Sequence, residues 1–202
     1  MSEKQRVAWE NKYRTQGALW SRSHDRWFDT KDDERVLDLG CGSGKSCASL
    51  AGEISAVDFS MTALGMLLDS MSTVNPICAD VAKLPFRDSQ FDCVRASFIL
   101  GHLEESERVA TIGEIKRVLR VGGRLAIEVF SRSDGRFLRK GAAAVGALEH
   151  EDDLLHSYFD EGQVRDMLIS FKVMSVSEEK WAQRIGNRES LDRSIIRAVA
   201  SK

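Results

Sequence analysis

Residues 37–46 read LDLGCGSGKS, a stretch whose glycines, lysine and serine could cradle a phosphate or another small ligand. A phosphate-binding loop needs a glycine, four residues and then Gly-Lys-Ser or Gly-Lys-Thr, because backbone N–H groups must wrap the phosphates before the lysine reaches them. Leu39 stands where that first glycine belongs, so the loop is one residue too short. The spacing argues against a nucleotide-hydrolysis site.

The dinucleotide fingerprint GxGxxG fits this stretch only in part. Gly40 and Gly42 match it, but Lys45 takes the place of the third glycine, which allows close packing of helix on strand. The pattern that does match is an acidic residue, an apolar residue and then a glycine at every second position, from Asp38 to Gly44. Such glycines let the chain turn sharply and let an aminoacyl or ribose group approach the backbone without a Cβ in the way.

Two further carboxylates follow along the chain. Asp58 ends an apolar run, where a carboxylate can accept hydrogen bonds from both hydroxyls of a ribose, although it could also cap the next helix. Asp80 comes before Val81 and could instead be a loop residue turned to solvent. Together with the glycine turn, the two carboxylates indicate a site for a nucleoside-containing cofactor.

Taken in order, these residues resemble the motifs of the class I, Rossmann-like S-adenosylmethionine-dependent methyltransferases, in their small single-domain form. The glycine turn is similar to the family's first motif, and residues 79–92 are similar to its xDxxxLPFxxxxFD stretch. Residues 95–103 and 115–125 resemble the family's fourth-strand segment and its RVLKPGGxL turn, with Val121 in place of the usual proline. The resemblance runs from about residue 36 to 130 and implies S-adenosylmethionine as cofactor and S-adenosylhomocysteine as product.

The resemblance also implies roles for particular residues. Asp80 should accept from the adenine amino group, and the Val81 N–H should reach a ring nitrogen. Tyr13 could meet the methionine carboxylate of the cofactor or simply pack, and His102 could act on the acceptor or only line the pocket. The expected cofactor-binding residues are Asp38, Gly40, Cys41, Gly42, Gly44, Asp58, Phe59, Asp80, Val81 and Ser97, and the candidate catalytic residues are His102 and Tyr13.

The acceptor is less defined, and three hypotheses stay open. We expect a small-molecule acceptor. Lys45 and residues 84–87 and 156–162 are similar to the branch of tRNA wobble-uridine methyltransferases, which have His-His where this chain has Gly101-His102, so a tRNA acceptor with a small protein partner is the alternative. A non-catalytic cofactor-binding subunit is the third. Weaker site candidates are Trp20, His24, Glu128, Arg132, His156 and Tyr158, and a basic strip for RNA, or else a solvated face, would comprise Arg132, Arg136, Arg139 and Lys140.

Alternating apolar patterns predict the elements that must position these residues. Strands are expected at 35–39, 53–58, 76–79, 91–97, 123–130, 171–181 and 194–200. Helices are expected after a Ser60 cap, over 109–119 and over 164–171, and Lys45 should begin the helix that follows the glycine turn. The alternation of strand and helix predicts an α/β fold with one doubly wound, mostly parallel seven-stranded sheet, an antiparallel C-terminal hairpin, helices on both faces and an N-terminal helical cap.

The whole chain, 1–202, should be a single domain. It divides into an N-terminal cap (1–30), a cofactor-binding core (35–130), an insertion over the site that fits no sheet element (131–160) and a C-terminal helix with the edge hairpin (161–202). A net charge of -2 offers no bulk attraction to nucleic acid or membrane. The four cysteines form no CxxC pair, so neither a metal site nor a disulfide is expected. No long apolar run is present, and the expected location is the cytoplasm.

Overall fold

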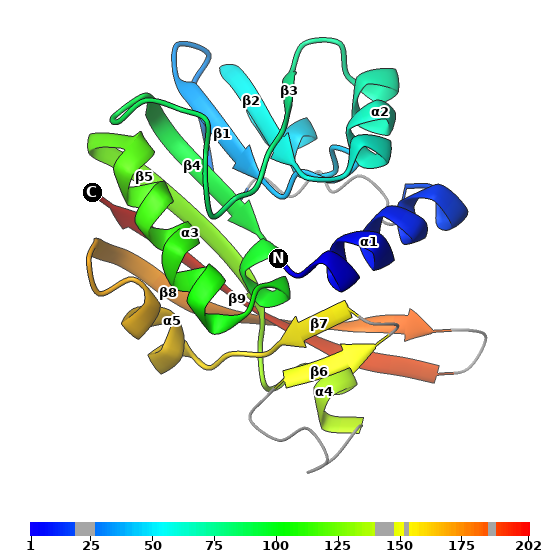
Figure 1. Cartoon of the computed structure of the whole chain (residues 1–202). Helices are drawn as coiled ribbons and strands as arrows, with labels where there is room; N and C mark the ends of the chain where they lie inside the picture. Colours follow the sequence, from blue (N-terminus) through cyan, green and yellow to red (C-terminus); the bar gives the residue numbers. More distant parts are fainter. Residues whose placement is uncertain (19–26, 140–147, 152–153, 186–188) are drawn as a thin grey trace.

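The computed structural model describes residues 1–18, 27–139, 148–151, 154–185 and 189–202. Seven strands form one sheet in the order β3-β2-β1-β4-β5-β9-β8 (Figure 1). Neighbours from β3 to β5 pair in parallel, and β9 pairs antiparallel with both β5 and β8. The strands are β1 (Arg35–Leu39), β2 (Glu53–Asp58), β3 (Asn75–Cys78), β4 (Phe91–Ser97), β5 (Leu119–Phe130), β8 (Lys172–Ile185) and β9 (Glu189–Ser201). The predicted α/β class, the mostly parallel sheet and the antiparallel C-terminal pair are confirmed.

The C-terminal hairpin is longer than its sequence pattern predicts. Pairing of β8 with β9 continues from Lys172 opposite Ser201 to Ile185 opposite Glu189. The predicted strands end earlier because the hairpin's far half is rich in polar residues such as Gln183 and Arg193, which do not look like a buried strand. In Figure 1 the hairpin of β8 and β9 extends past the ends of the other strands.

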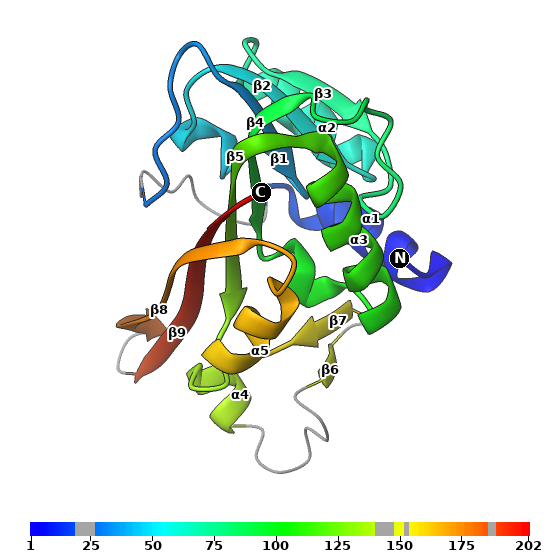
Figure 2. The ribbon, with the colours of Figure 1, turned by 90° about the vertical axis from the view of Figure 1, so that its left-hand side faces the viewer.

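Helices cover both faces of the sheet. Alternation within β1 sends Leu37 and Leu39 into one core, where they pack with α3 (Glu105–Val118) and α5 (Glu161–Met167). Val36 points the other way, into a second core with α2 (Met61–Ser70). Figure 2 shows α3 and α5 together on one side of the sheet. This two-faced burial explains why the strands read as nearly continuous apolar runs.

Local capping sets where the helices begin. Ser60 caps α2 as predicted, since its Oγ accepts from the Ala63 N–H at 3.1 Å. Asp160 and Gln163 form a reciprocal capping box at the start of α5. That helix ends at Met167, so Phe171 does not lie on its face as the pattern predicts; it is buried beyond the helix end.

Two expectations about connecting segments are wrong. Lys45 does not begin a helix, because the connection from β1 to β2 holds only the single 3₁₀ turn η1 (Cys47–Ser49). The insertion is not free of sheet structure: it contains α4 (Gly135–Arg139) and an antiparallel pair, β6 (Leu148–Glu151) with β7 (Leu154–Ser157). These short elements lack the length and periodicity that mark the main strands.

The N-terminal helix α1 (Glu3–Gln16) lies beside α2 and β7, where Trp9 and Tyr13 pack with Ala63 and Leu154. Within the described ranges, no helix is long and apolar enough to cross a membrane.

Candidate functional site

The turn after β1 can be built only with glycine. Gly40, Gly42 and Gly44 all have positive φ, at 66°, 51° and 91°. A Cβ on Gly40 would lie 2.7 Å from the Ile99 Cβ, and one on Gly42 would lie 2.5 Å from the Tyr13 hydroxyl oxygen. The absence of side chains therefore leaves a bare backbone surface at the carboxyl end of β1. In open α/β sheets, ligands bind at this end of the strands.

Asp58, at the end of β2, is tied to this turn. Its Oδ2 accepts from the Gly42 N–H at 2.9 Å, and its Oδ1 accepts from the Ser60 N–H at 2.9 Å. Burial is the largest influence on this carboxyl and raises its pKa to about 6, against the lowering effect of these hydrogen bonds. Each carboxylate oxygen can accept more than one hydrogen bond, so Asp58 both shapes the turn and can still receive ligand hydroxyls.

Asp38, in β1, is hydrogen-bonded to the residues that follow the glycine turn. Its Oδ2 accepts from the Ser46 hydroxyl at 2.5 Å and from the Cys47 thiol at 3.0 Å. Asp38 is completely buried and does not line the cavity described below. Burial raises its pKa, opposed by the nearby Arg95 guanidinium. The geometry assigns Asp38 to fixing the loop, and its part in cofactor binding stays a prediction.

Tyr13 reaches the turn from α1. It is buried, with its hydroxyl against Gly42, and burial together with the charge of Asp58 raises its pKa above the usual range. Glu10, one turn earlier on α1, accepts from the Ser60 hydroxyl at 2.5 Å and also from Thr62. α1 is thereby anchored to the start of α2, and Tyr13 is held over the glycines.

Asp80 and Val81 lie apart from the main cavity, beside a hollow of about 10 Å³ that Met1 and Phe59 also line. Asp80 Oδ1 accepts from the Ala82 N–H at 2.9 Å, and its Oδ2 lies 3.7 Å from an Arg6 guanidinium nitrogen. The hollow shares Met1, Gly40, Asp58, Phe59 and Ile99 with the lining of the larger cavity described next.

A cavity of about 810 Å³ opens from the glycine turn toward β5, β8 and β9. Its volume lies toward the upper end of the ~300–1,000 Å³ typical of small-molecule sites. The predicted site residues that line it are Tyr13, Gly40, Cys41, Gly42, Asp58, Phe59, Ser97 and His102, together with the weaker candidates Glu128 and His156. Gly44 does not line it and instead faces Leu67.

His102 lies at the wall of this cavity, in the 3₁₀ turn η2 (Ile99–His102) after β4. Its Nδ1 is 2.7 Å from the Leu155 carbonyl oxygen of β7, which requires Nδ1 to carry the proton. Its ring meets Trp9 edge to face at 4.9 Å and His156 at 4.8 Å. Burial lowers its pKa to about 4, so the ring is neutral at pH 7 and its Nε2 can accept a hydrogen bond.

Phe98 is strained at the same place. It has φ of 63°, in the left-handed region that a phenylalanine rarely adopts, and its N–H donates to the Glu128 carbonyl at 2.7 Å. Its ring stacks on Phe130 at 4.6 Å. Strain of this kind collects at ligand sites, and here it sets an aromatic surface beside Ser97 and His102.

Comparison with known proteins places this geometry in a family. Residues 37–127, which hold the glycine turn, Asp58, Asp80 and His102, match the family described as "Methyltransferase domain". The structure overlays on an S-adenosylmethionine-dependent methyltransferase from Methanosarcina mazei with a TM-score of 0.71 at 18% identity, over 86% of this chain and 94% of that one. Residues 37–127 therefore match a methyltransferase domain, and the overlay gives the chain the class I fold.

The chain is also similar to curated proteins. It is 41% identical to a demethylmenaquinone methyltransferase from Corynebacterium urealyticum over 57% of this chain and 50% of the relative. It is 33% identical to another from Corynebacterium kroppenstedtii over 71% of this chain and 66% of the relative. The chain thus spans about half to two thirds of the length of these relatives.

A second solved structure has the same fold over this entire chain. It is the complex between the Trm112 methyltransferase activator of Haloferax volcanii and a methyltransferase, with a TM-score of 0.72 at 15% identity over 100% of this chain and 99% of that one.

Several residues that line the cavity are missing from the site residues predicted from the sequence. They are Trp27, Phe130 and Trp181 and the largely buried arginines Arg193 and Arg197. Arg193 and Arg197 are four residues apart on a strand, so their side chains lie on the same face of the sheet. This spacing could have indicated from the sequence that the two side chains act together. Trp181 ends the strand predicted at 171–181, but the pattern did not indicate that its side chain lines the cavity.

The expected basic strip does not form in the described part of the chain. Arg132 pairs with Asp160 at 3.3 Å, Arg136 pairs with Asp134 at 3.2 Å, and Arg139 donates to the Ser190 carbonyl. Three side chains with three separate partners make no continuous surface.

Tyr158 is buried against Phe137 and does not line the cavity. Trp20, His24 and Lys140 fall outside the described residues. No group of metal-ligating side chains was found among the residues described.

Proposed function

We propose that this chain binds S-adenosylmethionine at the glycine turn and transfers a methyl group to a small aromatic molecule. The observation that supports it best is the turn itself, whose three positive-φ glycines and Asp58 hydrogen bond form a cradle that a Cβ would fill. The named relatives that methylate demethylmenaquinone support a small aromatic acceptor.

The chain's own residues would hold the cofactor along the turn. Gly40, Cys41 and Gly42 offer bare backbone to its amino-acid part, beneath the Tyr13 hydroxyl, and Gly44 lets the turn close over Leu67. Asp58 would accept hydrogen bonds from the ribose hydroxyls beside Phe59. Asp80 would accept one from the adenine amino group, and the Val81 N–H would donate one to a ring nitrogen. When bound, S-adenosylmethionine supplies an electrophilic methyl group on a positively charged sulfur.

On the acceptor side, Ser97 and His102 lie where the methyl group would be presented. Because Nδ1 of His102 is committed to Leu155, its Nε2 is the atom that can accept the proton or hydrogen bond of an acceptor hydroxyl. Trp9 and His156 hold the ring from two sides. Alignment of donor and acceptor can itself lower the barrier by roughly 7–11 kcal/mol.

Isothermal titration with S-adenosylhomocysteine tests cofactor binding, with Asp58→Asn as the variant that should weaken it. Incubation with methyl-labelled S-adenosylmethionine and a cell lysate, separated into metabolite, RNA and protein fractions, then tests the acceptor. Label in the metabolite fraction is the expected result. No binding at millimolar cofactor, with Asp58→Asn indistinguishable from the parent, contradicts the proposal.

A tRNA acceptor with a protein partner is the second candidate, and one observation favours it: the similarity in fold to the methyltransferase in complex with an activator. The separate pairing of Arg132, Arg136 and Arg139 weakens it, since RNA binding needs several free cations near phosphate. In the lysate experiment this candidate requires label in RNA, whereas a non-catalytic subunit predicts cofactor binding with no labelled fraction.

A further inference from the structure

Past His102 the cavity continues into a region that the cofactor residues do not reach. We call it the acceptor arm, lined by Trp27, Phe130, Arg136, Trp181, Arg193 and Arg197. It lies over β5, β9 and β8, on the sheet face to which Arg197 and Glu128 point. The residues here come from the N-terminal segment, the strand ends and α4, so their chemistry is a property of the tertiary structure.

The arm has room because the β1–β2 connection provides only the single turn η1. No helix from that connection covers the sheet face that carries Arg95, Glu128 and Arg197. Trp27 lies over this face instead. The guanidinium carbon of Arg197 is 5.1 Å from the centroid of the Trp27 ring, and the guanidinium carbon of Arg95 is 5.8 Å from it. One wall of the arm is therefore an aromatic ring set against cations.

The floor of the arm is aromatic as well. Phe130 stacks on Phe98, and the Arg136 guanidinium carbon lies 4.1 Å from the Phe130 ring centroid. Arg193 approaches the same ring at 5.4 Å and the Trp181 ring at 5.8 Å. A flat ring entering the arm from the His102 side thus meets π faces, and a group beyond that ring meets guanidinium N–H groups.

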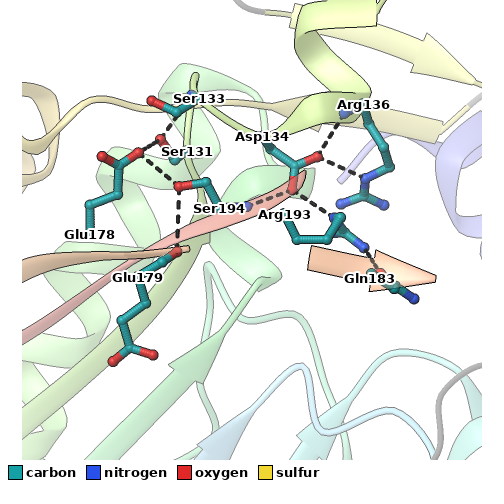
Figure 3. A network of polar contacts seen from close by, with 9 residues as sticks. All are labelled: Ser131, Ser133, Asp134, Arg136, Glu178, Glu179, Gln183, Arg193 and Ser194. Carbon is teal, nitrogen blue, oxygen red and sulfur yellow. Dashed lines mark hydrogen bonds and ion pairs between the residues drawn. The ribbon is translucent and has the colours of Figure 1, made fainter. Parts of the chain in front are cut away.

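Three arginines and three carboxylates meet at the end of the arm that lies farthest from the glycine turn. Arg197 is balanced by Glu128 at 3.0 Å and Glu179 at 2.7 Å. Arg136 and Arg193, in contrast, share the single carboxylate of Asp134, which lies between them in Figure 3. Asp134 is completely buried, and although burial works to raise its pKa, the hydrogen bonds from Arg193 and the backbone lower it, so it remains ionised.

This end is held rigidly by the network in Figure 3. Asp134 Oδ2 also accepts from the Ser194 N–H at 3.1 Å, and Glu178 accepts from the hydroxyls of Ser194, at 2.8 Å, and Ser131. The segment before α4 is thereby fixed to the β8–β9 hairpin. Preorganised donors of this kind favour a ligand because their ordering is complete before binding.

Both arginines keep donors to spare. Arg193 uses Nε on Asp134 and Nη1 on Gln183, and Arg136 uses only Nε. Within the part of the chain that the structure describes, the two terminal nitrogens of Arg136 have no hydrogen-bond partner, and Nη2 is buried. Lys45, on the cavity wall near the glycine turn, has no ion pair there either. A partly buried guanidinium with unused N–H groups can bind an oxyanion.

We infer that the acceptor arm selects an aromatic acceptor that carries a carboxylate, with the ring beside Phe130 and Trp181 and the carboxylate on Arg136 and Arg193. This inference rests on the proposed methyltransferase function and narrows its substrate class. It differs from the quinones in the relatives' names, because a carboxylate can accept from the N–H groups that Arg136 and Arg193 do not use within the described residues.

Binding to the protein loaded with S-adenosylhomocysteine tests this inference without turnover. The probes are hydroxynaphthoate and naphthol, which have the same ring with and without a carboxylate. Binding of each probe is measured by titration calorimetry and by the change in the fluorescence of Trp27 and Trp181. We expect hydroxynaphthoate to bind at least about tenfold more tightly than naphthol. Arg136→Gln should remove that preference without changing naphthol binding, Arg136→Lys should restore part of it, and the exposed Arg87→Gln should match the parent.

Equal affinity for the two probes overturns the inference, as does an Arg136→Gln variant that loses both probes alike while still binding S-adenosylhomocysteine. If Arg136→Gln does not fold, Lys45→Gln serves as the second variant, with Lys83→Gln as its exposed control, and a smaller selective loss of hydroxynaphthoate is expected. Failure of S-adenosylhomocysteine to bind the parent protein contradicts the proposed function, a result distinct from loss of probe discrimination.

Discussion

His102 and His156 meet edge to face, with ring centroids 4.8 Å apart and planes at 81°. One comes from the turn after β4 and the other from β7, which belongs to the small second sheet. The Leu155 carbonyl, next to His156, also fixes the tautomer of His102. The insertion after β5 therefore sets the protonation and orientation of a residue in the cofactor-binding core.

The buried state of His102 predicts a specific pH dependence of stability. Burial lowers its pKa from 6.5 to about 4, so between these values the unfolded chain binds a proton that the folded protein does not. The free energy of unfolding should then fall as pH drops through this window, by up to about 3 kcal/mol. Urea unfolding at pH 7 and pH 4.5 measures it, and the stability advantage of the parent over His102→Asn should shrink toward acid. A pH-independent difference between the two proteins contradicts the prediction.

Asp58 predicts a pH dependence of cofactor affinity with its own midpoint. Its pKa is raised to about 6, so the carboxylate that would accept ribose hydroxyls is fully present only above that pH. Affinity for S-adenosylhomocysteine should be flat above about pH 7 and should fall below pH 6 by at most about tenfold per pH unit.

The control for this prediction is Asp58→Asn, which should bind about 10–100-fold more weakly at pH 7.5 and show no such midpoint. Asp32→Asn, an exposed aspartate outside the cavity, should behave like the parent. The same pH profile in parent and Asp58→Asn would assign the midpoint to another group.

Gly42→Ala should damage the glycine turn more than its backbone angle alone accounts for. Its φ of 51° costs an alanine roughly 1 kcal/mol, and the new Cβ would also lie 2.5 Å from the Tyr13 hydroxyl oxygen. Gly122→Ala is the matched control, because Gly122 has φ of 74° and open space around its missing Cβ. We expect Gly42→Ala to lower the melting temperature further and to lose cofactor binding, whereas Gly122→Ala keeps it.

The double variant Gly42→Ala with Tyr13→Phe removes the hydroxyl that the Cβ meets. Partial recovery of the melting temperature is the expected outcome of thermal unfolding. If the double variant is no more stable than Gly42→Ala, the contact with Tyr13 is not the cause of the loss.

Only one thiol should react quickly in the folded protein. Cys41, Cys47 and Cys93 are buried, and burial raises the pKa of all three, that of Cys93 to about 12, whereas Cys78 is exposed. Titration with a chromogenic disulfide should count one fast thiol per chain and four after unfolding. Cys78→Ser should abolish the fast phase, and a second fast thiol in that variant would rule the prediction out.

Much of the cofactor side could be predicted because it depends on local rules. Glycines at 40, 42 and 44 are needed for positive φ, Ser60 caps a helix through its own hydroxyl, and β1, β2 and β4 have the predicted bounds because apolar runs of that length are buried on both faces. The prediction of a helix from Lys45 was wrong. No local signal in the sequence shows whether the segment between β1 and β2 forms a full helix or only the single turn η1. Asp38 stays a prediction as a cofactor-binding residue: its Oδ2 supports the loop, and a motif position does not reveal whether the carboxylate also contacts a ligand.

The sequence by itself determined the class of fold and the family of the cofactor turn, because both follow from periodicity and from residue types that only one backbone shape accepts. Tertiary structure decided the acceptor side: Trp27, Arg136, Trp181 and Arg193 are spread over more than 160 positions, and they share one cavity only after the hairpin, α4 and the N-terminal segment meet. Charge and burial at that meeting point depend on which groups become neighbours in space. No spacing along the chain encodes that two arginines will share the single buried carboxylate of Asp134.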